Sequence, residues 1–579
     1  MKTPGSLDAG GRFGRSLALV CGLYFLAATF HATWGLPNGN QTWAADSVAP
    51  MTPLAVAYRN FAEKGFDSGY FYFKYPAGHQ LLLATLTAPV VLAAYLRGDV
   101  RAIENEYPFG FSDPEPYLAA MALIARVLSA AFATGVVALI GDLTRRVCGT
   151  SAGGATAGLF AAIATAGCYP LLFYAHTSNV EAAFLFWAVL TLWATIVAVE
   201  ERRPRFFLLM GAGAALAVST KEQIVGFVIL LPIAIVTRQL AVAREERGIT
   251  RAIPRGAAAG AIAAIAVWVS ANAAFFNPSG FVNRLRFLTH TLPPDVRAEY
   301  AAYEFPIDFS SSWTLADEVR HVGKALTAVV SSVGWPTAIA ATAGLALAAR
   351  KQPRMLLYVA CAFFGYYGVS LRLLKQVELR YVLPWSILAA IPAGLFFASL
   401  AARGRVGRLV AVLACAFGLA YAGEVLWLLA NDARYDAEQW MAQRLHHGAS
   451  VEVYQSWTYL PRWQRTPGVT RPPVEAMSVA DITGRWPDFI VISSKGREGI
   501  TMYPNPDWRD GRGMMLEREE NKRMLAALEN GALGYEPIAR FENRLVFPRA
   551  LITSLNPAIE VYRRAGSAAS TPLVTSDGD

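Results

Sequence analysis

The stretch "PAGHQLLLATLTAPVVLAAYLRG", Pro76 to Gly98, decides how the chain is laid out relative to a membrane. Its apolar residues follow one another almost without a break, over the length of about 20 residues that one bilayer crossing requires. Whether this stretch crosses determines which side of the membrane every later loop faces. It therefore also determines which polar residues can share a site.

The composition is typical of a polytopic membrane protein. Of the 579 residues, 54% are hydrophobic and only 16% are charged, and apolar runs of membrane length recur along the chain. The net charge of +9 comes from short basic clusters between these runs. Such clusters encode orientation in membrane proteins, so they do not indicate nucleic-acid binding.

Eleven further apolar runs are predicted to span the membrane. They are residues 17–36, 118–141, 152–174, 181–199, 206–219, 223–237, 256–276, 323–349, 355–371, 381–402 and 408–430. The first run follows basic residues and could be a cleaved signal peptide, but its length favours a retained anchor.

The distribution of Lys and Arg argues that the opening stretch does not cross. With a cytoplasmic N-terminus and no crossing at Pro76–Gly98, the cytoplasmic connections after the first span hold sixteen Lys and Arg, and the short opposite connections hold eight. A crossing would place the sixteen outside, against the positive-inside rule. We therefore predict that Pro76 to about Leu96 lies in or dips into the outer interface, within an external loop over 37–117. The alternative is an ordinary span, with another span miscounted.

This topology gathers polar side chains from four external segments. In chain order they are Asp46, Lys74, Tyr75, His79, His176, Asn179, Glu181, Lys221, Glu222, Arg380 and Tyr381. Taken singly, an interfacial Lys or Arg is usually a snorkelling anchor, and a His or Glu at a helix end is usually a cap. Together they predict a site at the outer interface with carboxylates and several cations.

Carboxylates and cations at a lipid boundary suit one kind of chemistry. A carboxylate can act as general base on an acceptor hydroxyl, or can hold a divalent cation. Neighbouring cations stabilise a phosphate leaving group. A phosphate on a long isoprenoid tail would stay at the boundary between the membrane and the outside. The residues suggest this reaction but do not by themselves name it.

The order of elements resembles the GT-C glycosyltransferases. Within them it is similar to the family of protein O-mannosyltransferases and bacterial aminoarabinose transferases. The matching features are Asp46 in a long first external loop, "YFKYPAGHQLL" over 72–82, Glu181 opening a span, a "TK" turn at 220–221 and "RYVLP" over 380–384. The resemblance covers roughly residues 12 to 430. No single motif is specific, but their order is.

The resemblance implies a GT-C-like catalytic domain over residues 1–430, with about eleven transmembrane helices and juxtamembrane helices in the first external loop. It also implies a multi-pass enzyme of the cell membrane. The enzyme would transfer a sugar from a polyprenyl-phosphate donor to a lipid, glycan or protein of the envelope, at the external face and by inverting displacement. The sugar and the acceptor stay open.

Roles for the site residues follow from the same resemblance. The predicted catalytic residues are Asp46 and Glu181. The predicted ligands of the donor phosphate are Lys74, Lys221 and Arg380. The predicted substrate pocket contains Tyr75, His79, His176, Asn179, Glu222 and Tyr381. The sequence does not establish a cofactor, although Asp46 and Glu181 could hold a divalent metal ion. The family often has a second acid where this chain has Ser47, and Asp is more usual at the position of Glu181.

The remaining regions predict a second domain. Residues 431–565 form an expected external α/β domain, with strands at "ASVEVYQSWTYLP" and "DFIVISS" and a helix at "EREENKRMLAALEN". Residues 566–579 are expected to be a disordered tail. The external loop over 277–322 could gate substrate or simply cover the surface.

The main alternative function is a multi-pass transporter or lipid flippase. Such proteins carry functional polar groups near the midplane, often on broken helices, whereas most charges here lie at outer span ends. The five cysteines fall in spans or on the cytoplasmic side, so no external disulfide is expected. There is no Walker A sequence, zinc-binding spacing or dinucleotide fingerprint, which disfavours a nucleotide-driven mechanism.

Overall fold

The computed structural model falls into two compact units, which are described separately. The first contains residues 1–32, 51–105 and 121–426, and the second contains residues 33–50, 106–120 and 427–579. The described residues are 4–36, 42–44, 47–71, 75–104, 107–149, 151–245, 254, 256–289, 291–294, 296, 314–374, 377–445, 449–454, 457–462, 469–470, 478–494, 519–549, 552, 554–566 and 574–575.

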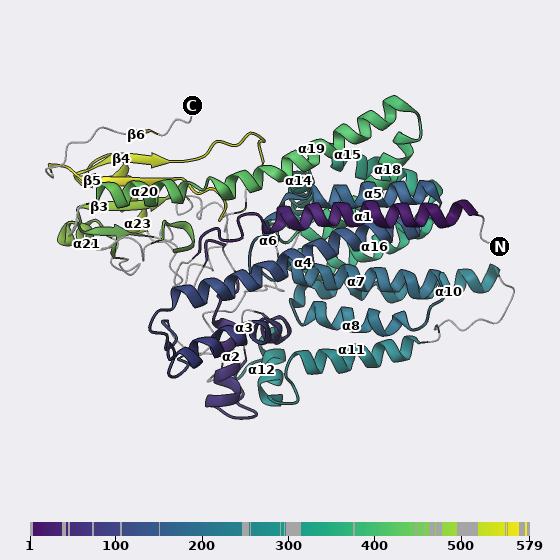
Figure 1. Ribbon diagram of the computed structural model, residues 1–579, viewed down its shortest axis with the longest axis horizontal. Helices are drawn as coiled ribbons and strands as arrows, with labels where there is room; N and C mark the ends of the chain where they lie inside the picture. Colours follow the sequence, from purple (N-terminus) through teal and green to yellow (C-terminus); the bar gives the residue numbers. More distant parts are fainter. Residues whose placement is uncertain are drawn as a thin grey trace. The chain divides into compact units, whose positions relative to one another are not determined.

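The first unit is helical (Figure 1). Its helices are α1 (Pro4–Thr29), α2 (Thr52–Tyr58), η1 (Arg59–Glu63), α3 (Ala77–Arg97), α4 (Glu115–Val147), α5 (Ala152–Ala166), α6 (Tyr169–Ala175), α7 (Glu181–Glu200), α8 (Phe206–Val218), η2 (Glu222–Ile224), α9 (Val225–Ile229), α10 (Leu231–Glu245), α11 (Ala257–Ala271), α12 (Pro278–Leu288), α14 (Leu315–Val333), α15 (Trp335–Lys351), α16 (Pro353–Tyr366), η4 (Tyr367–Leu371), α17 (Arg372–Leu374), α18 (Leu383–Ala401) and α19 (Arg405–Ala430). The first residues of α4 and the last of α19 belong to the second unit.

The helices confirm a multi-span membrane protein. By length and apolar composition, seven of the described helices could cross a bilayer, or nine if each of two bent pairs counts as one span. These numbers include α3, which is not one of the eleven predicted spans. Helices α8 and α11 are apolar but shorter. Helix α3 meets the criterion, so the prediction that it lies in the outer interface stays a prediction.

Two of the expected spans are each divided by a bend, which the sequence did not indicate. The run 152–174 divides into α5 and α6, which are bent by 65°, and the run 323–349 divides into α14 and α15, bent by 117°. At the second break Gly334 has a φ of 76°, which glycine adopts without steric cost, and a proline follows at the start of α15.

Small residues set how closely the spans pack. Helix α8 packs between α7 and α11, and these helices run side by side in Figure 1. A Cβ atom on Gly211 of α8 would lie 1.9 Å from the carbonyl oxygen of Gly260 in α11. Only glycine permits this approach, which is typical of helix contacts inside membranes. The contact fixes α8, and with it the turn that follows Val218.

The second unit confirms the predicted α/β domain, with a mixed six-stranded sheet ordered β2-β1-β3-β5-β4-β6. The strands are β1 (Val451–Val453), β2 (Val469–Thr470), β3 (Phe489–Ser493), β4 (Tyr535–Phe541), β5 (Ile559–Arg564) and β6 (Val574–Thr575). Strands β2, β1 and β3 are parallel, β5 is antiparallel to β3 and β4, and β6 is parallel to β4. Strand β6 therefore places two residues of the tail expected to be disordered in the sheet.

Helices cover both faces of this sheet. Apolar side chains of α20 (Ala433–Arg444) share a core with one face, and those of α21 (Val479–Arg485) and α23 (Glu519–Glu529) share a core with the other. Strands β1 and β3 and helix α23 lie in the three stretches predicted for them.

Candidate active site

The turn after α8 joins several elements of the first unit. Ser219 accepts a hydrogen bond at its carbonyl oxygen from the Gly78 N–H of α3, at 3.1 Å. Its Oγ accepts another from the Asn272 amide, just after α11, at 2.8 Å. A Cβ atom on Gly78 would lie 2.8 Å from Ser219, so α3 can approach only because this residue is glycine. Ser370 of η4 donates to the carbonyl oxygen of Gln223.

Lys221 and Glu181 form a buried ion pair. Lys221 Nζ donates to Glu181 Oε1 at 2.9 Å, and the two side chains are 9% and 0% exposed. Glu181 is the first residue of α7, where the helix dipole favours a carboxylate. Its second oxygen, Oε2, is buried and has no hydrogen-bond partner among the described residues. The sequence predicted both residues for the site, and the fold brings them together.

Aromatic rings surround this pair. Lys221 Nζ lies 5.2 Å from the ring centre of Phe184 and 5.6 Å from that of Tyr381. Arg380, also predicted for the site, lies 4.8 Å from the same Tyr381 ring and forms an ion pair of 2.7 Å with Glu378. The Tyr381 ring is therefore a shared contact for two of the predicted phosphate ligands, Lys221 and Arg380.

A second ion pair holds the next residue of the turn. Arg284 of α12 donates to Glu222 Oε1 through Nε at 2.8 Å and through Nη2 at 2.5 Å. Three cations of the site are thus each paired with a carboxylate: Lys221 with Glu181, Arg284 with Glu222, and Arg380 with Glu378.

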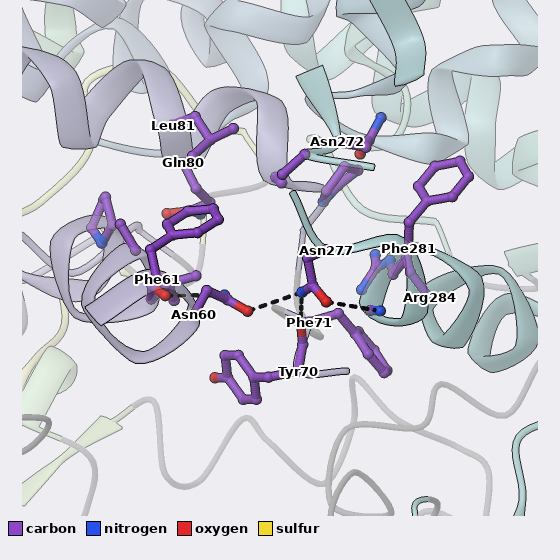
Figure 2. A pocket seen from close by; sticks show the side chains of 17 residues that line it. Asn60, Phe61, Tyr70, Phe71, Gln80, Leu81, Asn272, Asn277, Phe281 and Arg284 are labelled. Atoms are coloured by element: carbon purple, nitrogen blue, oxygen red, sulfur yellow. Dashed lines mark hydrogen bonds between the residues drawn. The ribbon is translucent and has the colours of Figure 1, made fainter. Parts of the chain in front are cut away.

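A pocket lies beside Arg284 (Figure 2). It is lined by the amides Asn60, Gln80, Asn272 and Asn277, by the rings of Phe61, Tyr70, Phe71 and Phe281, and by Arg284 and smaller apolar residues. Amides beside aromatic faces are a lining that suits a ligand with hydroxyl groups and an apolar side.

Asn277 connects the walls of this pocket. Its Oδ1 accepts from the main-chain N–H groups of Gly69 and Gly280, at 3.1 and 3.0 Å. Its Nδ2 donates to Asn60 Oδ1 at 3.0 Å and to the Tyr70 carbonyl oxygen at 2.6 Å (Figure 2). The Asn277 amide is therefore structural.

Gln80 differs from the other amides of the pocket. The residue is 1% exposed, and neither its Nε2 nor its Oε1 has a hydrogen-bond partner among the described residues. A buried amide without partners costs free energy, so native proteins usually complete such a group with another polar group, a water or a ligand. Gln80 is the polar group of this pocket that is best placed to bind a ligand.

Two predicted site residues, Asp46 and Lys74, lie outside the described residues. The second unit does describe the segment just before Asp46. Trp34 donates from Nε1 to Asp432 Oδ2 at 2.9 Å, and the Arg434 guanidinium lies 4.1 Å from the ring centre of Trp43. These contacts tie that segment to the start of α20.

The remaining predicted residues are buried. Tyr75 and His79 are 6% and 3% exposed, and His79 Nδ1 has no hydrogen-bond partner among the described residues. The two ring nitrogens of His176 lie 2.7 Å from the Leu172 carbonyl oxygen and 3.0 Å from that of Ala27, which favours a structural role. Asn179 is 1% exposed.

No group of three His, Cys, Asp or Glu side chains that could hold a metal ion occurs within the described part of the chain. Glu181, one of the two predicted ligands, shares its carboxylate with Lys221. The predicted metal site therefore stays a prediction.

Reasoning from sequence missed Gln80, Asn60, Asn277 and Arg284 as site residues. The sequence does indicate a structural role for Asn277, because Asn followed by Pro is a typical helix start. Asn277 does cap α12. In the sequence, Arg284 stands out only as one basic residue of the predicted external loop over 277–322. Nothing local distinguishes Gln80 within its apolar run.

The ion-paired residues Glu181 and Lys221 fall in one continuous segment from α4 to α11, and this segment connects the chain to known proteins. Residues 118–270 match the family model of dolichyl-phosphate-mannose-protein mannosyltransferases. The match confirms the resemblance to protein O-mannosyltransferases for this part of the chain. No curated protein sequence matches.

Solved structures with a similar arrangement include two enzymes. One is ArnT from Cupriavidus metallidurans bound to undecaprenyl phosphate, with 14% sequence identity, a TM-score of 0.46 and coverage of 84% of this chain and 94% of that one. Another is the oligosaccharyltransferase of Archaeoglobus fulgidus, with 13% identity, a TM-score of 0.43 and coverage of 84% and 71%.

Proposed function

We propose that this chain is a membrane glycosyltransferase. It moves a sugar from a polyprenyl-phosphate donor to a lipid, glycan or protein acceptor at the external face, by inverting displacement. The observation that carries the proposal is the buried ion pair of Lys221 and Glu181 within the segment that matches the mannosyltransferase model.

The reaction requires a base and a stabilised leaving group. The acceptor hydroxyl attacks the anomeric carbon, its proton passes to a carboxylate, and the bond from that carbon to the phosphate oxygen breaks with its electron pair on the phosphate. We assign the base to Asp46. Lys74, Lys221 and Arg380 are assigned to the phosphate, because fixed cations stabilise charge that develops there.

The ion pairs explain how cations could be held ready for a phosphate. An unpaired Lys or Arg at this depth would be costly, and a carboxylate partner lowers that cost. Lys221 donates one hydrogen bond to Glu181, and an ammonium group has three donors. A phosphate can therefore share Lys221 without breaking the pair.

The pocket beside Arg284 supports a place for the transferred sugar. Gln80 offers one donor and one acceptor group to sugar hydroxyls, and aromatic rings offer an apolar face.

The test uses the purified chain in nanodiscs with a radiolabelled polyprenyl-phosphate hexose. Arg380→Ala should weaken donor use and leave acceptor dependence largely unchanged. Arg320→Ala is the matched control, because Arg320 is 67% exposed and lies 3.8 Å from its partner Asp317. Equal donor dependence in the two variants would remove Arg380 from the phosphate site.

The acceptor needs a separate experiment. Cell-envelope glycans and glycolipids are compared with and without the protein, and a missing glycan or glycolipid identifies the sugar and the acceptor. An unchanged envelope together with no turnover in nanodiscs would count against glycosyl transfer as a whole.

A further inference from the structure

A basic cleft lies where three apolar helices end, away from the residues of the candidate active site. The cleft has a volume of about 430 Å³ and is lined by Arg145, Arg146, Val147, Ile196, Glu200, Glu201, Arg203 and Arg354. These residues come from the end of α4, the end of α7 and the loop after it, and the start of α16. Four arginines against two glutamates give the lining a net charge of +2.

The carboxylates of this region are already bound by buried or partly buried groups. Arg238 donates to both oxygens of Glu200, at 2.7 and 3.0 Å, and the Tyr358 hydroxyl donates to Glu200 Oε1 at 2.9 Å. Arg146 forms ion pairs with both Glu201 and Asp142. The charges of these carboxylates are therefore largely neutralised by groups other than Arg203 and Arg354.

Arg203 and Arg354 are held much more loosely. Their side chains are 52% and 55% exposed. Their ion pairs are long, with Arg203 Nε at 3.3 Å from Glu201 and Arg354 Nη1 at 3.5 Å from Glu200. Both residues line the cleft. They can bind an anion without breaking a tight pair.

The position of the cleft indicates which anion. Helices α4 and α7, and the helical segment Pro353–Leu374 that contains α16, are each long and apolar enough to cross a bilayer. Residues at the end of such helices lie at the depth of the lipid headgroups. A guanidinium fork matches the oxygens of a phosphate, and basic pockets between spans are suited to anionic headgroups. Val147 and Ile196 give the lining an apolar part that suits the first carbons of the acyl chains.

We propose that this cleft binds the phosphate headgroup of an anionic membrane phospholipid, with Arg203 and Arg354 as the residues that contact the phosphate. The proposal is independent of glycosyl transfer, since none of its residues belongs to the candidate active site.

The test measures lipid retention by native mass spectrometry. The full-length protein in detergent is incubated with an equimolar mixture of phosphatidylglycerol and phosphatidylcholine that share acyl chains. The unaltered protein should retain phosphatidylglycerol. The double variant Arg203→Gln/Arg354→Gln should lose that preference by roughly tenfold, because each basic residue contributes substantially to binding an anionic headgroup.

The matched control is Arg403→Gln/Arg408→Gln. These two arginines are also exposed and lie at another helix connection on the same predicted side. Their substitution removes the same amount of charge. It should not change the preference. The milder variant Arg203→Lys/Arg354→Lys keeps the charge but removes the planar fork, and should give an intermediate loss.

Two results would overturn the proposal. Full preference in the glutamine double variant would show that these arginines only anchor helix ends. The second such result is that inorganic phosphate at millimolar concentration displaces phosphatidylglycerol and raises the thermal midpoint equally well. In that case the site would take a small anion, and the lipid assignment would be wrong.

Discussion

Lys221 Nζ lies 2.9 Å from Glu181 Oε1, although 40 residues separate the two along the chain. The pair joins the turn after α8 to the first residue of α7, and both side chains are removed from solvent. A buried ion pair contributes little net stability, but the loss of one partner leaves the other charge uncompensated. The pair therefore predicts a characteristic pattern of single and double variants.

Lys221→Met should lower the free energy of unfolding by about 3–5 kcal/mol, because Glu181 would remain buried without its cation. The double variant Glu181→Gln/Lys221→Met should recover most of that loss. Thermal unfolding in detergent measures both variants. A single variant as stable as the unaltered protein would mean that Glu181 finds another partner. If Lys221 also contacts the donor phosphate, the double variant should stay poorly active after stability returns.

Asp46→Asn should lower turnover by roughly 10²–10⁴ and leave the thermal midpoint nearly unchanged, because the change removes a general base. Steady-state transfer from a polyprenyl-phosphate sugar measures this loss. Asp67→Asn is the control from the same loop. Asp67 accepts hydrogen bonds from the Ser279 N–H and hydroxyl at 2.6 and 2.9 Å, so its variant should lose some stability and retain turnover. Normal turnover by Asp46→Asn would exclude Asp46 as the base.

Gln80→Leu should leave stability unchanged or slightly raised, because the Gln80 amide is buried and has no hydrogen-bond partner in the part of the chain that the structure describes. The KM for the donor should rise roughly tenfold if this amide binds the sugar. Asn277→Ala is the contrasting variant, since it breaks four hydrogen bonds and should cost about 2 kcal/mol or more. If Gln80→Leu destabilised the protein as Asn277→Ala does, the Gln80 amide would be structural.

Membrane orientation can be tested without any activity. A reporter fused after Glu106 should read external, and one fused after Arg146 should read cytoplasmic, because the positive-inside rule places the basic clusters in the cytoplasm. Readings on the opposite sides would make α3 a true span. They would also separate the first loop from the other segments assigned to the site.

Much of the fold could be predicted from the sequence, because apolar run length is a local property. Each predicted span falls on one helix or on two or three consecutive ones, and the polar C-terminal region contains the predicted α/β domain. The breaks at Gly334 and between α5 and α6 were missed. An apolar run does not reveal a bend where its hydropathy continues through the break.

The charged residues of the site could be partly predicted, because a charged residue beside an apolar run is also a local feature of the sequence. Glu181 opens an apolar run after a polar turn, and Lys221 sits between two short runs, so both stand out against their neighbours. Their positions at helix ends follow from local pattern. Their pairing was not predicted, since a local pattern contains no information about which helix ends meet.

Tertiary structure alone decided the partners and the pocket. Arg284 binds Glu222 across 62 residues, and Asn277 reaches Asn60 across 217. Gln80 is 1% exposed and its amide has no hydrogen-bond partner among the described residues, and its apolar sequence neighbours give no sign of this. The sequence by itself determined which segments enter the membrane, through the free energy of burying apolar side chains. The packing of helices over small residues determined which polar groups meet.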